Sequence, residues 1–322
     1  LLKMEVPRDE NNSPVWLNDD FFLQVIREFT HDPNARLCHG CKLRPGTKPG
    51  EHFASVMYRT TIHYRCQQGK EASVDVIMKI KPYQPGLKKD VLEEGDLFLR
   101  EIRIYSQVLP EMKRRLEEIG ETFNYPRLIY ASEKPHTILI LEDVSAKGWQ
   151  TGGYITSFEE VVPAIKAIAK FHAASVVMEQ DRPNGEVQDT MLIDYQICSW
   201  TTPVVDLYYL LDTIVDQSVK EQHRDAMVYL YYEELRRLLH QLGWLGRVTS
   251  LQELHIELLR KGAIELFHYV ALYPYRFVDR SKIDFEALLS GKGSNPAASS
   301  PVYRRVMREV LTKFLHQGVM EP

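Results

Sequence analysis

The feature that most constrains the fold is a change of hydrophobic period near Glu142 and Asp143. Before this point, several short runs alternate apolar and polar residues between turn residues, which is typical of strands with one buried face. After it, apolar residues recur at helical spacing almost to the end of the chain. This order predicts an α+β protein of two lobes, with a small mixed β-sheet lobe followed by a larger helical lobe.

The strand region predicts a hairpin. Residues 54–64 and 73–80 read as strands, and a short turn containing Gly69 joins them. A helical region is expected over residues 91–119 with a break at Pro110, followed by two short strands over residues 128–131 and 137–141. An earlier helix is expected to be capped by Asp19 or Asp20. Further elements are predicted beyond Asp143, namely helices over residues 158–174, 203–215, 222–242, 251–270 and 302–316, and an isolated strand over residues 190–194.

These elements suggest three regions. Residues 1–19 lack periodicity and are expected to form a flexible amino-terminal segment. Residues 20–143 are predicted to form the first lobe, and residues 144–322 the helical lobe. Ligands commonly bind in the cleft between two such lobes.

Composition excludes several classes of function. Hydrophobic residues make up 44% of the chain and charged residues 26%, as in globular proteins. The net charge of -4 and the lack of a long basic run predict no nucleic-acid partner. Uninterrupted apolar runs are too short for a membrane span, so no membrane partner is expected. No charged-then-apolar leader pattern is expected from the residues given, which start at Leu1 with the first Met at Met4 and leave targeting open. Cys38 and Cys41 have no matching second pair for zinc. We therefore expect reduced thiols and a cytoplasmic location.

Two charged residues lie among apolar neighbours in the first lobe. Lys79 lies in the strand over residues 73–80, and Glu101 follows in the next helix. A strand lysine is more often a solvated edge residue, but a carboxylate on a buried helical face needs a partner. A lysine of the third strand paired with a glutamate of the next helix holds nucleotide phosphates in kinases. The turn at residues 50–55 lies one hairpin upstream, where a phosphate-covering loop is expected, although a single glycine is weak support for it.

The helical lobe contains three further candidates. Asp194 ends a short apolar strand, where a carboxylate is well placed to bind Mg²⁺ and also fits an ordinary turn. Asp206 lies in the first turn of a helix, where the helix dipole alone accounts for it. His172 faces the apolar side of its helix and is interpreted as a core histidine with satisfied hydrogen bonds.

The order and spacing of these residues resemble the ecdysteroid-kinase-like family of insects. This is a CHK kinase-like branch of the kinase superfamily, related to choline kinases and aminoglycoside phosphotransferases. The similarity extends from about residue 20 to the end of the chain. The motifs that carry it lie at residues 50–59, 76–79, 98–110, 139–144, 169–175 and 192–196, followed by Pro203, Asp206 and Leu207.

The resemblance implies a protein-kinase-like fold and transfer of a phosphoryl group from ATP, with Mg²⁺, to a small-molecule alcohol, with steroids among the candidates. It places the phosphate loop between Gly50 and Ser55. Lys79 is then expected to contact the phosphates and to pair with Glu101. The backbone near Glu142 is expected to bind adenine. The resemblance further implies that Asp194 binds Mg²⁺ and that Asp206 supports the catalytic loop.

The chain departs from the family pattern at one place. The family has a His-Gly-Asp loop, followed by an asparagine, between the positions that correspond to His172 and Asp194, and this chain has none there. Asn184 and Gly185 form a strong hairpin signal whose first strand is missing. We interpret the junction near Gln180 and Asp181 as a deletion that removes part of the catalytic core. No catalytic base is identifiable, and Glu179 and Asp181 are the weak substitutes.

Three functions therefore remain open. The chain is an active or impaired phosphotransferase, a non-catalytic pseudokinase that binds nucleotide or a partner, or a carrier of small ligands in its helical lobe. A protein kinase is not expected, because no Asp-Phe-Gly or Ala-Pro-Glu pattern occurs.

Overall fold

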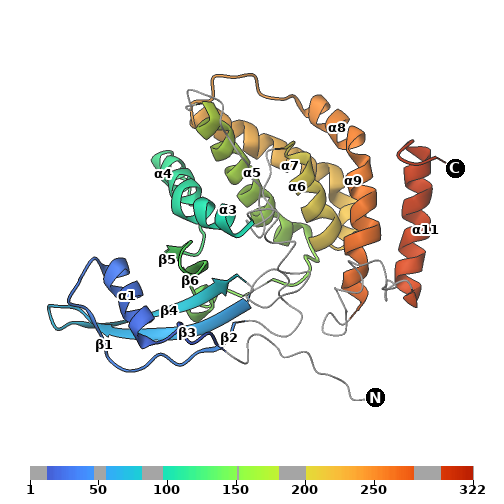
Figure 1. The fold of residues 1–322 in the computed structure, drawn as a ribbon. Coiled ribbons are helices and arrows are strands. Elements are labelled where there is room, and N and C mark those ends of the chain that lie inside the picture. Colours follow the sequence, from blue (N-terminus) through green and yellow to red (C-terminus); the bar gives the residue numbers. More distant parts are fainter. Residues whose placement is uncertain are drawn as a thin grey trace, which may run out of the picture. The chain divides into compact units, whose positions relative to one another are not determined.

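The computed structural model describes residues 13–46, 56–81, 97–150, 152–180, 201–278 and 299–321 (Figure 1). The chain divides into two compact units. The first comprises Leu1–Gln107 and Tyr125–Gln150, and the second comprises Val108–Asn124 and Thr151–Pro322. The first unit holds a β-sheet and the second is helical, so the predicted α+β class is confirmed.

The sheet of the first unit is antiparallel in every pairing among the described residues. The predicted mixed sheet is therefore wrong. Two pairs of strands that are consecutive in the sequence are joined by short turns, and such turns allow only antiparallel pairing. The pairing of β6 (Ile138–Glu142) with β4 (Glu71–Ile80) is also antiparallel. The strand order is β1-β3-β4-β6-β5, with β2 also on β3. The strands are β1 (Arg36–Leu37), β2 (Arg44–Pro45), β3 (Val56–Arg65), β4 (Glu71–Ile80), β5 (Leu128–Ser132) and β6 (Ile138–Glu142).

The hairpin of β3 and β4 is the centre of this sheet. Its register runs from Val56 opposite Ile80 to Arg65 opposite Glu71. Gly69 in the turn has a positive φ of 79°, a conformation that glycine adopts without steric cost. Side chains alternate between the two faces of each strand. One face is a continuous apolar surface that packs against helix α1 (Asp19–Thr30), whose core residues are Phe22, Val25 and Ile26.

The N-cap of helix α1 lies one residue before Asp19, the first of the two predicted caps. The side chain of Asn18 accepts a hydrogen bond from the Phe21 backbone N–H and is the N-cap. Asp19 and Asp20 instead lie in the first turn, where carboxylates interact favourably with the helix dipole.

The predicted helical region around Pro110 consists of two helices joined by a π-helical turn. Helix α3 (Leu97–Arg103) continues through the π-helical turn Ile104–Val108 into α4 (Leu109–Glu118). Pro110 lies in the first turn of α4. Backbone N–H groups of a first turn have no partner within the helix, so proline, which lacks an N–H, is tolerated there. The irregularity therefore precedes the proline.

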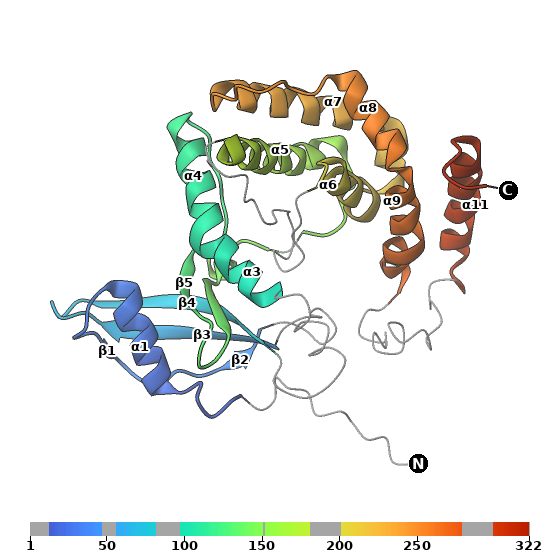
Figure 2. The same cartoon turned by 45° about the horizontal axis from the view of Figure 1, so that its top comes forward.

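Helices α5 (Phe158–Gln180) and α7 (Gln217–Gln241) lie side by side in the second unit, as both views show (Figures 1 and 2). Of the described helices, α5 alone is long and apolar enough to cross a membrane, and 56% of its most apolar window is buried. Such burial is typical of a core helix. The expectation of no membrane partner depended on the short length of uninterrupted apolar runs. Such runs do not reveal a long helix like α5.

The remaining helices of the second unit agree with the predicted positions. Two of the predicted helices contain a π-helical turn. The predicted helix over residues 203–215 is α6 (Val204–Tyr209) with the π-helical turn Leu210–Ile214. The helix over residues 251–270 divides into α8 (Leu251–Arg260), α9 (Gly262–Phe267) and the π-helical turn His268–Leu272. Helix α11 (Pro301–His316) packs against this turn through a core that includes Tyr269, Tyr303 and Phe314. The predicted strand over residues 190–194 lies outside the described residues.

Candidate functional site

Two charged side chains of the central hairpin, Arg59 of β3 and Lys79 of β4, lie on the face of the sheet opposite α1. In β4, Val74, Val76 and Met78 belong to the core shared with α1. Because side chains alternate along a strand, Lys79 points to the other face. Arg59 of β3 lies on this same face, since it pairs with Ile77, two positions before Lys79.

Lys79 forms an ion pair with Glu101 of α3. The Lys79 Nζ lies 2.6 Å from Glu101 Oε1, and the exposed fractions of the two side chains are 17% and 1%. A buried carboxylate needs a compensating charge, which the lysine supplies. The structure thus brings together the two side chains that the sequence analysis singled out. Their role in binding nucleotide stays a prediction.

Glu142 ends β6, and its side chain forms an ion pair of 2.6 Å with Lys147. Its backbone N–H donates to the Arg127 carbonyl at 2.9 Å. The next N–H, of Asp143, donates to the Asp75 carbonyl at 2.8 Å. These two N–H groups already stabilise the sheet, so a nucleobase near Glu142 must use other backbone groups of this segment. That refinement could not be seen in the sequence.

Arg59 forms a second charged cluster that the sequence analysis missed. Its guanidinium contacts both carboxylate oxygens of Asp143 at 3.0 and 3.1 Å, and also the hydroxyl of Ser145 at 2.8 Å. Its Nε donates to the Gly46 carbonyl at 2.7 Å. Arg59 has the same sequence signal as Lys79, because it is a charged residue within a largely buried strand.

In the second unit, His172 joins α5, α6 and α7. Its Nε2 lies 2.9 Å from Asp206 Oδ2, and its Nδ1 lies 2.8 Å from the Tyr231 hydroxyl. Burial, and then the charge of Asp206, raise the pKa of Tyr231 well above its usual value. The phenol therefore stays protonated, and each ring nitrogen of His172 has one hydrogen-bond partner. His172 is a satisfied histidine, as predicted, and Asp206 has His172 as a partner.

A buried ionic cluster lies on two π-helical turns of the same unit. Lys220 contacts Asp212, Glu265 and the Tyr269 hydroxyl, and His268 Nδ1 lies 3.1 Å from the second oxygen of Asp212. Burial alone would lower the pKa of Lys220, but the charges of Asp212, Tyr269 and Glu265 outweigh it and raise that pKa. The cluster holds α7 to α9 and to both π-helical turns.

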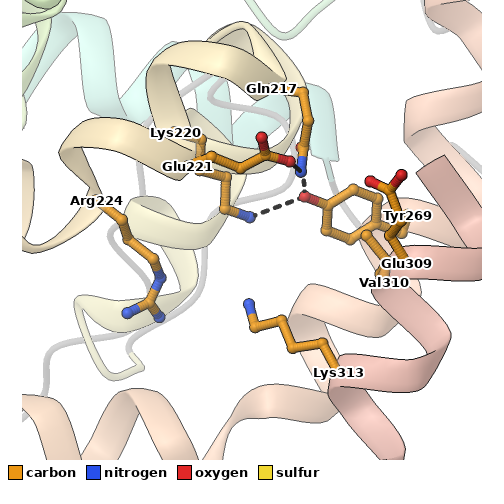
Figure 3. A pocket seen from close by; sticks show the side chains of 8 residues that line it. All are labelled: Gln217, Lys220, Glu221, Arg224, Tyr269, Glu309, Val310 and Lys313. Atoms are coloured by element: carbon orange, nitrogen blue, oxygen red, sulfur yellow. Dashed lines mark hydrogen bonds between the residues drawn. The ribbon is translucent and has the colours of Figure 1, made fainter.

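A pocket of about 270 Å³ borders this cluster (Figure 3). Lys220 and Lys313 point toward its centre, and Tyr269 hydrogen-bonds both Lys220 and Gln217. Its lining combines aliphatic and aromatic surface with charged groups. The lining residues are Gln217, Lys220, Glu221, Arg224, Tyr269, Glu309, Val310 and Lys313.

The sequence profile of the ecdysteroid kinase-like family matches residues 49–185 and 177–244, more than half of the chain. The chain belongs to the ecdysteroid kinase-like family. A search of the curated proteins finds no significant match. The Lys79–Glu101 pair and strands β3 to β6 lie inside the matched region of this ecdysteroid kinase-like protein, and the sheet and helical units are consistent with a kinase-like fold.

The family match is broken into two segments at one place. These segments overlap at residues 177–185, around the junction where the sequence analysis locates a deletion. Glu179 lies on α5 just before this junction. Its buried Oε2 has no hydrogen-bond partner within the described part of the chain. The other candidate bases and ligands of this ecdysteroid kinase-like chain, Asp181 and Asp194, lie outside the described residues, as do Gly50 and Ser55.

The ranges that the structure covers contain no group of three or more His, Cys, Asp or Glu side chains that could hold a metal ion. The cysteines described, Cys38, Cys41 and Cys66, are free thiols. Burial, assisted by the nearby charge of Asp19, raises the pKa of the Cys41 thiol to about 11, so it is a poor nucleophile near neutral pH.

Proposed function

We propose that this ecdysteroid kinase-like chain binds ATP through its first unit and is an impaired ATP-dependent phosphotransferase whose acceptor is a small-molecule alcohol. The observation that carries the proposal is the partly buried Lys79–Glu101 ion pair on the face of the sheet opposite α1. Glu101 fixes the lysine ammonium in one place, where it can contact a phosphate oxygen. Steroids are among the candidate acceptors.

The chain's own residues would act mainly by positioning. Phosphoryl transfer depends on alignment of the reactants and on neutralisation of charge, so a fixed lysine contributes by holding the phosphates. Bound Mg²⁺ would supply further neutralisation of the phosphate oxygens. Asp194 is the residue proposed to hold it. We also propose that the protein acts in the cytoplasm without nucleic-acid or membrane partners, as its net charge of -4 and free thiols favour.

A non-catalytic nucleotide-binding role is the second candidate. It is supported by the break of the family match at residues 177–185, where the sequence lacks a His-Gly-Asp loop. A pseudokinase would keep the Lys79–Glu101 pair for binding and lose turnover. The two candidates share the nucleotide site and differ only in catalysis.

Nucleotide binding is tested by replacing Lys79. We expect Lys79→Ala to weaken binding of ATP, measured with Mg²⁺ by titration calorimetry, by about 10- to 100-fold, as for loss of a hydrogen bond to a charged group. Adenosine has no phosphates, so it should bind the wild type and the variant equally. A loss confined to ATP would therefore report phosphate contact rather than misfolding.

Lys70 provides a matched control for this experiment. It is an exposed lysine in the turn of the same hairpin, at the other end of β4. Lys70→Ala should leave the Kd for ATP unchanged. If Lys79→Ala binds ATP as tightly as the wild type does, Lys79 is not part of the site, and absence of ATP binding by the wild type refutes the proposed function itself.

A further inference from the structure

Arg59 connects three segments of the first unit that are far apart in the sequence. It lies on β3, on the same face of the sheet as Lys79. One guanidinium contacts Asp143 and Ser145, which follow β6, and Gly46, which follows β2. Only 27% of the Arg59 side chain and 5% of the Asp143 side chain are exposed, so the pair is well shielded from solvent.

The Asp143 end of this contact is a fixed structure. Asp143 caps the short 3₁₀ helix Val144–Lys147 by accepting from the Ser145 backbone N–H at 3.1 Å. The Ser145 hydroxyl donates to the same carboxylate at 2.6 Å. The Asp143 backbone is tied to β4 through Asp75. A charge-assisted contact from Arg59 Nη1 to both carboxylate oxygens of Asp143 therefore fixes the direction in which the chain leaves β6.

The Gly46 end is also tightly held. The Gly46 N–H donates to the Met57 carbonyl at 2.8 Å, and the Gly46 carbonyl accepts from Arg59 Nε at 2.7 Å. A Cβ added at Gly46 would lie 2.8 Å from the Met57 Cβ, and Cβ atoms do not approach other atoms this closely. The glycine therefore lets the backbone approach β3 closely. Residue 46 is the last one described before the segment that contains the proposed phosphate loop.

We propose that Arg59 is a positioning residue for the nucleotide, holding the segment after β6 and the backbone at Gly46 in register with Lys79. This inference rests on the proposed function. Arg59 is neutralised by Asp143, so its effect is indirect, through the backbone that it fixes. It thereby differs from Lys79, whose proposed contact is with the phosphates themselves.

The difference between adenosine and ATP tests this role. Because the segment after β6 is the proposed adenine site, Arg59→Met should raise the Kd of both adenosine and ATP, measured with Mg²⁺, by about 10-fold, the effect of one hydrogen bond to a charged group. Lys79→Ala should raise the Kd of ATP alone. A purely structural Arg59 would lower the unfolding temperature and leave both Kd values of the folded protein unchanged.

Two matched variants sharpen the measurement. Arg65 lies on the same strand and pairs with Glu71, but the exposed fractions of these side chains are 59% and 62%. Arg65→Met should leave both Kd values unchanged, because an exposed ion pair fixes little. Arg59→Lys keeps the charge but cannot reach Asp143 and Gly46 together, so its Kd values should fall between those of the wild type and of Arg59→Met.

The outcomes separate this inference from the proposed function. Wild-type protein that binds neither ligand overturns both. Wild-type binding combined with unchanged Kd values in Arg59→Met overturns the positioning role and leaves the proposed function standing. Should Arg59→Met fail to fold, Asp143→Asn removes the charge at the other end of the pair, and the adenosine Kd of that variant decides in the same way.

Discussion

Insertion of a His-Gly-Asp segment between Gln180 and Asp181 should raise the rate of phosphoryl transfer by at least about 100-fold. The segment would come from another family member and would include the asparagine that follows the loop. A general base alone contributes about 10²- to 10⁴-fold. The asparagine and the loop that orients the acceptor should add to this, although such contributions do not combine independently. The measurement is ADP release with a panel of sterol and amino-alcohol acceptors.

The matched control is the same insertion with its aspartate replaced by asparagine. This variant has the same length and the same repaired strand, but it lacks the base. It should bind nucleotide like the repaired chain and turn over like the original one. Similar rates for the original and the repaired chains would contradict the prediction. Glu179→Gln and Asp181→Asn would then show which carboxylate acts as the base.

The hairpin of the first unit was well predicted because its pattern is local. Burial alternates along β4 and along β3 from Tyr58 onward, and the turn at Gly69 sets their register. Lys79 and Glu101 stood out because each is a charged residue among apolar neighbours, although 22 positions separate them. What could not be predicted is the placement of β6 beside β4, which no turn specifies. That placement makes the sheet antiparallel throughout its described pairings.

The Arg59–Asp143 contact could not be predicted for the same reason. Its two residues are 84 positions apart, and they meet only because β4 and β6 are neighbours in the sheet. Arg59 carried the same signal as Lys79, but Asp143 was interpreted only as the last residue of the first lobe. A long-range pair of this kind needs the sheet order as well as the strand pattern.

The π-helical turns of the second unit also left no signal in the sequence. Apolar residues continue at helical spacing through Leu210–Ile214 and His268–Leu272, so both were predicted as regular helix. A π-helical turn closes hydrogen bonds to the fifth residue and is often found at functional sites. Here these turns bring Asp212 and Tyr269 to the buried Lys220, whose partner Glu265 is 45 positions away. None of the residues of this cluster could therefore be identified from the sequence.

Replacing Lys220 should strongly destabilise the second unit, because its ammonium is the cation that two buried carboxylates share. Lys220→Met keeps the length of the side chain but leaves Asp212 and Glu265 buried without that cation. Loss of one partner from a buried ion pair costs about 3–5 kcal/mol in the free energy of unfolding. The measurement is urea unfolding followed by circular dichroism. Lys313→Met is the matched control, since Lys313 contacts the same Glu265 oxygen at 3.1 Å but has a side chain that is 39% exposed. It should cost only about 0–1 kcal/mol.

The pH dependence of stability provides an independent check of the same cluster. Burial raises the pKa of Glu265, but the charges of Lys220 and Lys313 outweigh this and lower it to about 2, from an ordinary value of 4.5. A carboxyl group whose pKa is lowered on folding stabilises the protein fully above its unfolded pKa and loses that contribution as the pH falls. The wild type should therefore lose stability between about pH 4.5 and pH 2 through this group, and Lys220→Met should lose less over the same range.

Equal destabilisation by Lys220→Met and Lys313→Met, together with unchanged acid dependence, would show that Lys220 does not hold this cluster together. Adding Glu265→Gln to Lys220→Met should recover part of the lost stability, because it removes one of the two uncompensated charges.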